Sequence, residues 1–446
     1  MAHPPSDGAG DLPGVSVSDL ETHLCELVQQ LHPVAPDGPR GRGRPRILPA
    51  MLLWCGVVVT VLRQLPSQLA IWRLITSQGL WHFPAVRVTD DAVYKRLATE
   101  GPTAMQHLFE QITTLLAAQP SPASTPDLAP FASRIVAIDQ TTLDPVLRLF
   151  PATDETPARR ERVLPGKLAA VFDVRRQLFH RIEYLDDPNQ NERVLARTLI
   201  ADLPPGSLIL ADQGYFSFPW FDHLTETGYF WISRIPAKVS TTTIHTFYAD
   251  EHVSDTLVWL GAYRADRAKH AVRLVSFPVG PVTMRYLTNV RDPGMLPIAQ
   301  IAQVYARRWD IELAFKLVKR HLGLHLLWSG KDAVLLTQVW AVLVIAQVLH
   351  GMRQQIAEAA QVDLFDVSEA LLIQYLPQYL ARDPDGMQTF IREGRRLGFI
   401  RPSRRLQIRA PAIAPEAITP VPSTLILERT PRQSHRPPWQ HRPRRN

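Results

Sequence analysis

Cysteine is scarce in this sequence. Cys25 and Cys55 are the only two among 446 residues, which excludes a disulfide framework and a zinc site built from several cysteines. Long hydrophobic runs are also missing, since the longest apolar stretches, 51–62 and 339–346, fall short of the roughly 20 residues that span a bilayer. No basic segment followed by an apolar one opens the sequence, so no signal peptide is predicted. These absences favour a cytoplasmic protein without a membrane partner, with both apolar stretches in buried helices.

Most of the chain also lacks a surplus of charge of either sign. The formal net charge is +7, but residues 401–446 hold ten arginines and two acids, a net +8, which leaves −1 for the first 400 residues. A basic protein favours an acidic partner such as nucleic acid. Contacts made by the body of the protein must therefore come from local patches, while the Pro-rich tail is predicted to be disordered.

Composition changes divide the chain into segments. We predict a disordered start at 1–16, a helical N-terminal domain that binds DNA at 17–117, and a Pro/Ser-rich linker at 118–130. The first part of an α/β core at 131–237 and a β-rich insertion at 238–290 follow. A long helix and C-terminal helices fill 291–400, and the basic tail fills 401–446.

Two features of the N-terminal domain could contact DNA. Four arginines alternate with Gly and Pro, which prevents a helix and allows an extended arm along a DNA groove; they are Arg40, Arg42, Arg44 and Arg46. The alternative for this segment is a solvated linker. A helix is predicted to begin after Thr89 as its N-cap, and it could serve as a recognition helix or be an ordinary surface helix.

The core alternates between apolar strands and amphipathic helices. Strands are predicted at 134–139, 167–174, 179–186, 207–212 and 229–235, and helices at 191–200 and 218–227. Three strands followed by α/β alternation are typical of a mixed sheet with helices on its faces. The expected fold class is therefore α/β, with the β-rich insertion interrupting the sheet and the helical domain in front.

Two of these strands end in a carboxylate. Asp139 closes RIVAID and Asp212 closes SLILAD. A single acid in this position often caps a turn, but two on one rigid sheet suit a hard divalent cation, which prefers oxygen ligands at fixed positions.

A third acid, Glu312, lies on a predicted long helix. This helix has Pro297 at its first position and continues through His321. At about 100° per residue, four polar residues share one stripe about 60° wide; they are Tyr305, Arg308, Glu312 and Lys319. Lys316 lies beside the stripe. The outer two residues fall about 10 Å along the axis from Glu312, too far to share its metal ion but suited to DNA phosphates. The alternative is a solvated helix face.

The opposite face of this helix is largely apolar, and Arg307 and Asp310 interrupt it. Their spacing of three residues predicts an ion pair. Asp310, with Asp144 and Asp173, is an acid near the expected site that is not expected to act in catalysis.

The spacing Tyr-x2-Arg-x3-Glu-x6-Lys in YARRWDIELAFKLVK resembles the YREK signature of the insertion-sequence-four family of bacterial DDE transposases. Asp139 in AIDQTT and Asp212 in ADQGY resemble the family's first two catalytic motifs, and the β-rich insertion matches its layout. The resemblance covers about residues 130–350. Gln213 departs from it, because many relatives have Arg there.

The resemblance implies a ribonuclease-H-like core and a transposase that cleaves and rejoins DNA. Asp139, Asp212 and Glu312 would bind two Mg²⁺ or Mn²⁺ ions, and Tyr305, Arg308 and Lys319 would grip phosphates of the transposon end. It also implies double-stranded DNA and a second copy of the chain as partners, and an aromatic side chain that holds a flipped base; Trp231, Tyr248 and Trp259 are candidates. A domesticated nuclease of this fold and an inactive DNA-binding relic remain alternatives.

Overall fold

The computed structural model describes residues 47–77, 79–80, 83–118, 128–143, 166–185, 192–236, 238–261, 267–324, 327–329, 331–380, 385–403 and 408–430. The chain divides into two compact units, each with its own contacts. One contains the helices before residue 119 and those of 316–403, and the other contains the sheet and the segment 408–430. The predicted start at 1–16, the arginine arm, Asp144 and the end of the tail lie outside the described residues.

The helical unit is built around one long apolar helix. Its described helices are α2 (Ala50–Leu62), α3 (Leu69–Ser77), α4 (Asp90–Glu100), α5 (Thr103–Ala118), the π-helix η3 (Leu317–His321), α12 (Asp332–Ala359), the short η4 (Leu364–Asp366), α13 (Glu369–Leu380) and α14 (Gly386–Gly394). Thr89 caps α4 as predicted, since its hydroxyl accepts a hydrogen bond from the Ala92 N–H at 3.2 Å.

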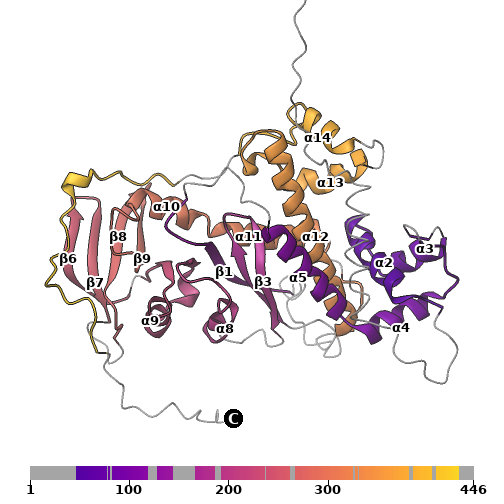
Figure 1. The fold of residues 1–446 in the computed structure, drawn as a ribbon, viewed down its shortest axis with the longest axis horizontal. Helices are drawn as coiled ribbons and strands as arrows, with labels where there is room; N and C mark the ends of the chain where they lie inside the picture. The colour runs from indigo at the N-terminus through magenta and orange to yellow at the C-terminus, as the bar shows by residue number, and fades with distance from the viewer. Residues whose placement is uncertain are drawn as a thin grey trace, which may run out of the picture. The chain divides into compact units, whose positions relative to one another are not determined.

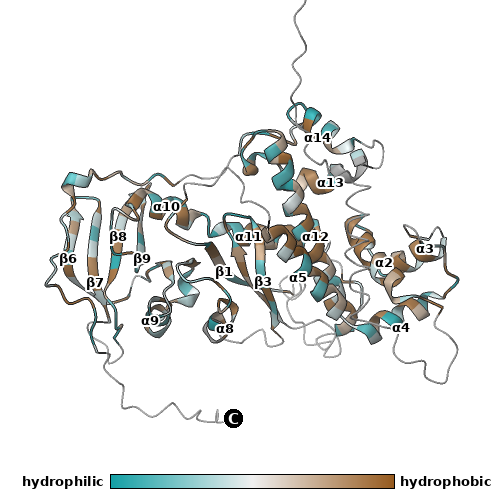
Figure 2. Cartoon of the chain, viewed as in Figure 1, coloured by the Kyte–Doolittle hydropathy of each residue, from teal (hydrophilic) through white to brown (hydrophobic). Residues whose placement is uncertain are grey.

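Helix α12 is apolar on nearly all sides and therefore needs a cover. By length and composition it could cross a membrane, yet 89% of its most apolar window is buried inside the protein. Helices α2 and α5 supply part of the cover, and Gln347 of α12 donates a hydrogen bond to Thr113 of α5 at 2.7 Å. Figure 2 shows α2 mostly in brown, in keeping with its buried residues. Both apolar stretches thus form buried helices, which confirms the prediction.

The N-terminal helices do not form a domain of their own. They share one compact unit with α12–α14, whereas the sequence predicted a separate domain at 17–117. The physical reason is that α12 has too much apolar surface for the later helices alone, and amphipathic α5 buries its apolar side against it.

The second unit contains a nine-stranded sheet. Its strands are β1 (Ile135–Thr142), β2 (Lys167–Asp173), β3 (Leu178–Leu185), β4 (Leu208–Ala211), β5 (Phe230–Arg234), β6 (Thr241–Ala249), β7 (Ser254–Leu260), β8 (Val272–Val279) and β9 (Val282–Thr288), with helices α8 (Glu192–Leu199), α9 (Phe218–Glu226), α10 (Ile298–Ala306) and α11 (Trp309–Lys316). The order across the sheet is β3-β2-β1-β4-β5-β9-β8-β7-β6 (Figure 1). The predicted mixed α/β architecture is confirmed.

The β-rich insertion continues this sheet. Strands β1, β4 and β5 run parallel to one another, β2 and β3 are antiparallel, and β9 joins β5 in antiparallel pairing. The insertion therefore places β6 at one edge of the sheet and leaves β3 at the other.

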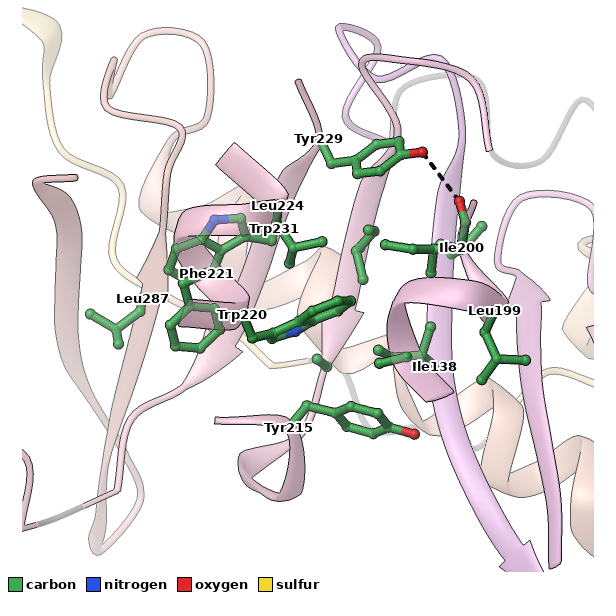
Figure 3. Packing of buried hydrophobic residues seen from close by; sticks show 14 of the residues in the cluster. Ile138, Leu199, Ile200, Tyr215, Trp220, Phe221, Leu224, Tyr229, Trp231 and Leu287 are labelled. Carbon is green, nitrogen blue, oxygen red and sulfur yellow. Dashed lines mark hydrogen bonds between the residues drawn. The ribbon is translucent and has the colours of Figure 1, made fainter. Parts of the chain in front are cut away.

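Aromatic packing fixes helix α9 to the sheet. The rings of Phe221 and Trp231 stack 4.1 Å apart with an interplanar angle of 8°, and the Tyr229 hydroxyl donates a hydrogen bond to the Ile200 carbonyl at 3.2 Å (Figure 3). Stacked and fully buried rings of this kind contribute strongly to a core. They fix the amino end of β5 against α9 and against the residue that follows α8.

The segment 408–430, which we call the strap, packs on the insertion. The Thr419 N–H donates to the Phe247 carbonyl of β6 at 2.8 Å, and the Ala271 N–H donates to the Leu427 carbonyl at 2.9 Å. Leu425 and other apolar strap side chains pack against the cluster around Phe247. Figure 1 shows this yellow segment passing β6. For these residues the prediction of a disordered tail at 401–446 was wrong, because scattered apolar side chains meet a ready-made apolar sheet face.

Candidate functional site

Two acids lie toward the carboxyl ends of adjacent parallel strands. Asp139 follows four buried residues of β1, and the strand continues past it to Thr142, so this acid lies within the strand rather than at its end. The parallel partner β4 pairs with β1 only at 135–137 and ends at Ala211. Asp139 is therefore flanked by Ala170 of β2 on one side and left open on the other.

Asp212 follows β4 directly. Its side chain accepts a hydrogen bond from the Gly214 N–H at 2.8 Å and so caps the short helix η2 (Gln213–Tyr215). Because β1 and β4 are parallel neighbours, their carboxyl ends point to the same edge. The structure thus brings the two predicted acids together.

The long predicted helix is broken into three parts. Pro297 is the N-cap of α10 rather than its first residue, α10 ends at Ala306, and α11 begins at Trp309 after the turn Arg307–Arg308. Beyond Lys316 the chain forms a π-helix, in which the rotation per residue differs from 100°. The predicted single stripe from Tyr305 to Lys319 is therefore not a feature of the structure.

Arg308 joins two of the acids. Its Nη2 lies 2.6 Å from Glu312 Oε1, and its Nη1 lies 3.8 Å from Asp139 Oδ2. Burial opposes the charge of this guanidinium, yet Tyr305, Glu312 and Asp139 raise its pKa above the ordinary value. Glu312 and Asp139 thus pair with the same permanently charged side chain.

Tyr305 is buried beneath this pair instead of facing solvent. Its hydroxyl donates a hydrogen bond to the Ala211 carbonyl, the last residue of β4, at 3.2 Å. Burial raises its pKa. In this structure the role of Tyr305 is to fix the end of β4, and with it Asp212, against α10, so the predicted phosphate contact is not open to it here.

Asp139 is poorly stabilised in its charged form. Burial is the largest cause that raises the pKa of Asp139 to about 7, and the charges of Asp212 and Glu312 add to it. The Gln140 N–H and Arg308 act in the opposite direction. A nearby cation stabilises the charged form of a carboxyl group whose pKa is raised in this way.

Carboxylate oxygens are the donors that Mg²⁺ and Mn²⁺ prefer, so the chemistry of Asp139, Asp212 and Glu312 fits such ions. Among the residues that the structure describes, however, no three His, Cys, Asp or Glu side chains lie close enough together to hold a metal ion as they stand. The Glu312 carboxylate is directed to the Arg308 guanidinium instead.

Two nearby acids have structural partners instead. Asp310 is buried, pairs with Arg307 at 2.7 Å as predicted, and accepts a hydrogen bond from Gln177 Nε2 at 2.7 Å. Asp173 accepts hydrogen bonds from the N–H groups of Arg175 and Arg176 at 3.0 and 2.9 Å and shapes the turn after β2. Both carboxylates are thus committed to the fold.

The remaining predicted DNA contacts lie elsewhere in the chain. Lys316 ends α11 and is exposed, and Lys319 lies in the π-helix of the helical unit. Gln213, the departure from the family pattern, places its Nε2 3.4 Å from the Ile235 carbonyl. That contact links the loop after β4 to the end of β5 without involving the acids.

The three candidate aromatic residues are now distinguishable. Trp231 is 1% exposed and stacked on Phe221, so it is closed to a ligand. The Arg429 guanidinium of the strap covers the Trp259 ring at 4.5 Å. Tyr248 is partly exposed and donates a hydrogen bond to Asp250 at 2.7 Å.

Two residues near the acids were missed from the sequence. Trp309 is 55% exposed at the start of α11, with the Arg308 guanidinium 5.0 Å from its ring centroid. Arg234 is an exposed cation at the carboxyl end of β5, and its charge acts on Tyr305. A cation that closes an apolar run, as in YFWISR, was a usable signal for Arg234, whereas a helical Trp is more often buried.

Comparison with known proteins finds similarity to transposases over the sheet unit. Residues 130–347 match the family model described as Transposase DDE domain. The chain is 21% identical over 175 residues to the candidate transposase y4zB of Sinorhizobium fredii. The aligned segment covers 38% of this chain and 49% of that protein. The chain thus spans about half the length of this curated relative.

Among solved structures, a cryo-EM structure of the piggyBac transposase synaptic complex with hairpin DNA is similar at 10% sequence identity and a TM-score of 0.42. The similarity covers 89% of this chain and 87% of that one.

Proposed function

We propose, from the premise that residues 130–347 carry a transposase DDE domain, that this protein binds the ends of an insertion sequence, cleaves the DNA and transfers the strands to a target. One observation carries the proposal: Asp139 and Asp212 lie toward the carboxyl ends of adjacent parallel strands, and the Arg308 guanidinium pairs with both Asp139 and Glu312. The strand order β3-β2-β1-β4-β5 supports a ribonuclease-H-like core, and the spacing of Tyr305, Arg308, Glu312 and Lys319 supports the YREK branch.

In this proposal Asp139, Asp212 and Glu312 would hold two Mg²⁺ or Mn²⁺ ions. When bound, such ions would activate the attacking oxygen and stabilise the leaving one in phosphodiester transfer. Asp212 and Glu312 reach the site from elements that the core fixes, and Tyr305 keeps the end of β4 in place through Ala211. A rigid placement of this kind is what in-line phosphoryl transfer needs.

Arg308 and Arg234 of the sheet unit would contact DNA phosphates. Lys316 and Lys319 of the helical unit would contact phosphates as well. The arginine arm of residues 40–46 and helix α4 would read the transposon end. We further propose that two copies of the chain act on paired ends in the bacterial cytoplasm.

The test is cleavage and strand transfer of a DNA fragment that carries the element's own ends, in Mg²⁺ or Mn²⁺. Asp139→Asn, Asp212→Asn and Glu312→Gln should each lose cleavage by several orders of magnitude while DNA affinity stays within a few-fold. Glu251→Gln, an exposed acid in the turn after β6, is the matched control and should cleave normally. Near-normal nicking by any of the three variants would remove that residue from the site, and cleavage without strand transfer would favour the nuclease.

A further inference from the structure

We propose that Arg308 is a latch on the metal site: its guanidinium holds Glu312 away from the shared site until a DNA phosphate draws it off. Metal loading and DNA binding would then be coupled. This inference rests on the proposed function and adds a regulatory step to the same site.

The first support is the competition for Glu312. Arg308 Nη2 lies 2.6 Å from Glu312 Oε1, a short charge-assisted hydrogen bond, and Nη1 lies 3.8 Å from Asp139 Oδ2. The Arg308 side chain is buried. Its guanidinium and a divalent cation would repel each other strongly there, because water is excluded. A divalent ion between these two carboxylates would meet the guanidinium, so the two cations exclude each other.

The second support is that the Arg308 guanidinium does not use all of its hydrogen-bond donors. The buried Nε of Arg308 has no hydrogen-bond partner in the described part of the chain, and 3.8 Å to Asp139 is too long for a hydrogen bond. A phosphate offers two oxygens that match the fork of Nε and Nη. The group that now binds Glu312 therefore gains a hydrogen bond by moving to a phosphate.

The third support is the position of Arg308 in the chain. It lies in the turn between α10 and α11, outside both helices, and its guanidinium lies 5.0 Å from the ring centroid of exposed Trp309. The Arg308 N–H donates a hydrogen bond to the Tyr305 carbonyl at 3.0 Å, which fixes the backbone of the turn, while the buried guanidinium borders the exposed Trp309 ring. The latch would therefore open by rotation of the Arg308 side chain. Phosphate at the surface beside Trp309 can reach it without unfolding the site.

The experiment measures Mn²⁺ affinity of the full chain by calorimetry, with and without a short duplex of arbitrary sequence at low salt, after subtraction of Mn²⁺ bound by the duplex alone. In the wild type, DNA should raise Mn²⁺ affinity by about 5–150-fold, the usual range of such coupling. In Arg308→Ala, Mn²⁺ should bind more tightly without DNA, by a similar factor, and DNA should add little. Arg308→Gln, which removes the charge but fills more of the space than Ala, should behave in the same way if the Ala variant is poorly folded.

The controls separate this inference from the proposed function. Arg320→Ala removes an exposed positive charge and should leave the coupling unchanged. Asp139→Asn should lose Mn²⁺ binding in every condition. If Asp139→Asn loses Mn²⁺ but the wild type shows no coupling, or Arg308 variants bind Mn²⁺ no better, the latch is overturned and the metal site stands. If the wild type binds no Mn²⁺ even with DNA, both the latch and the proposed metal chemistry fail.

Discussion

Asp310 and Asp139 are both acids that interrupt apolar surroundings in the same unit, and their partners determine their different roles. Asp310 is closed in by Arg307 and Gln177. Asp139 has one backbone hydrogen bond, from the Gln140 N–H, and an elevated pKa. A carboxylate whose lone pairs are used by the fold stabilises it, and one left unsatisfied is available for a ligand.

We therefore expect Asp310→Ala to act on stability and not on chemistry. The variant leaves the Arg307 guanidinium largely buried without its partner, which should lower the free energy of unfolding by about 3–5 kcal/mol. Urea denaturation measures this, and cleavage per folded molecule should stay near the wild-type value below the transition. A folded Asp310→Ala protein that no longer cleaves would place Asp310 in the site.

Trp309 offers a second test at this scale. It is exposed, so Trp309→Ala should leave the melting temperature nearly unchanged. Stacking on nucleic-acid bases contributes about 1–3 kcal/mol per base, and we expect DNA affinity to fall by that amount in a fluorescence anisotropy titration. Leu313→Ala, also exposed on α11, is the control and should bind normally. Equal losses in both variants would point to a general effect on α11.

At the scale of elements, the ends of α12 and α13 are joined by a charged cluster. Glu369 at the start of α13 accepts a hydrogen bond from Arg353 Nη1, and His350 Nδ1 lies 3.4 Å from the same oxygen. Burial alone would raise the pKa of Glu369, but Arg353 and His350 lower it to about 2. The charged carboxylate is therefore bound more favourably in the folded state than in the unfolded chain.

This gives a pH dependence with a defined sign. Because the folded pKa lies below the unfolded value near 4.5, the stabilisation is complete above about pH 4.5 and is lost as the pH falls toward 2. Glu369→Gln should cost about 3 kcal/mol at pH 7, and the difference from wild type should shrink between pH 4.5 and 3. Urea denaturation at several pH values checks this, with exposed Glu358→Gln as the control. A difference that is independent of pH would contradict it.

The elements also show how far the sequence alone could lead. Apolar runs ending in acids predicted β1 and β4 to within a few residues, because buried strands leave a strong pattern. The break at Arg307–Arg308 and the burial of Tyr305 were not predictable, since a helical period cannot reveal a turn that keeps nearly helical backbone angles. The strap was missed because its apolar residues are sparse, and the insertion surface that orders them lies more than a hundred residues away in sequence.

At the scale of the whole molecule, the shared core of the helical unit changes how truncations must be interpreted. The Leu116 side chain of α5 lies 2.7 Å from where a Cβ on Gly351 of α12 would be, so the two helices pack closely. A chain that begins at Pro130 should therefore expose α12 and lose the cooperative unfolding of that unit. Circular dichroism with urea would show this, and an unchanged transition would restore the idea of an independent N-terminal domain.

The charge distribution gives the other prediction at this scale. Residues 431–446 hold five arginines and no acid, and a cut after Thr430 leaves the strap intact. Salt dependence of DNA affinity follows the number of phosphates neutralised, with a slope of about −0.9 per contact. The truncated chain should show a shallower slope, by up to about 4.5, for transposon-end and scrambled DNA alike. An unchanged slope would show that these arginines do not touch DNA.

The position of the strap in the sequence affects the order in which the sheet is completed during synthesis. Strand β6 ends at Ala249, and the residues that hydrogen-bond to it and cover its neighbours are translated ~160 residues later. At the usual rates of synthesis this delay is about 10–30 s. During that interval a nascent chain presents a nine-residue edge strand with unpaired backbone groups, the feature most prone to pairing with a neighbouring chain on the same messenger. Translation speed between β9 and the strap should therefore govern how much newly made protein escapes aggregation.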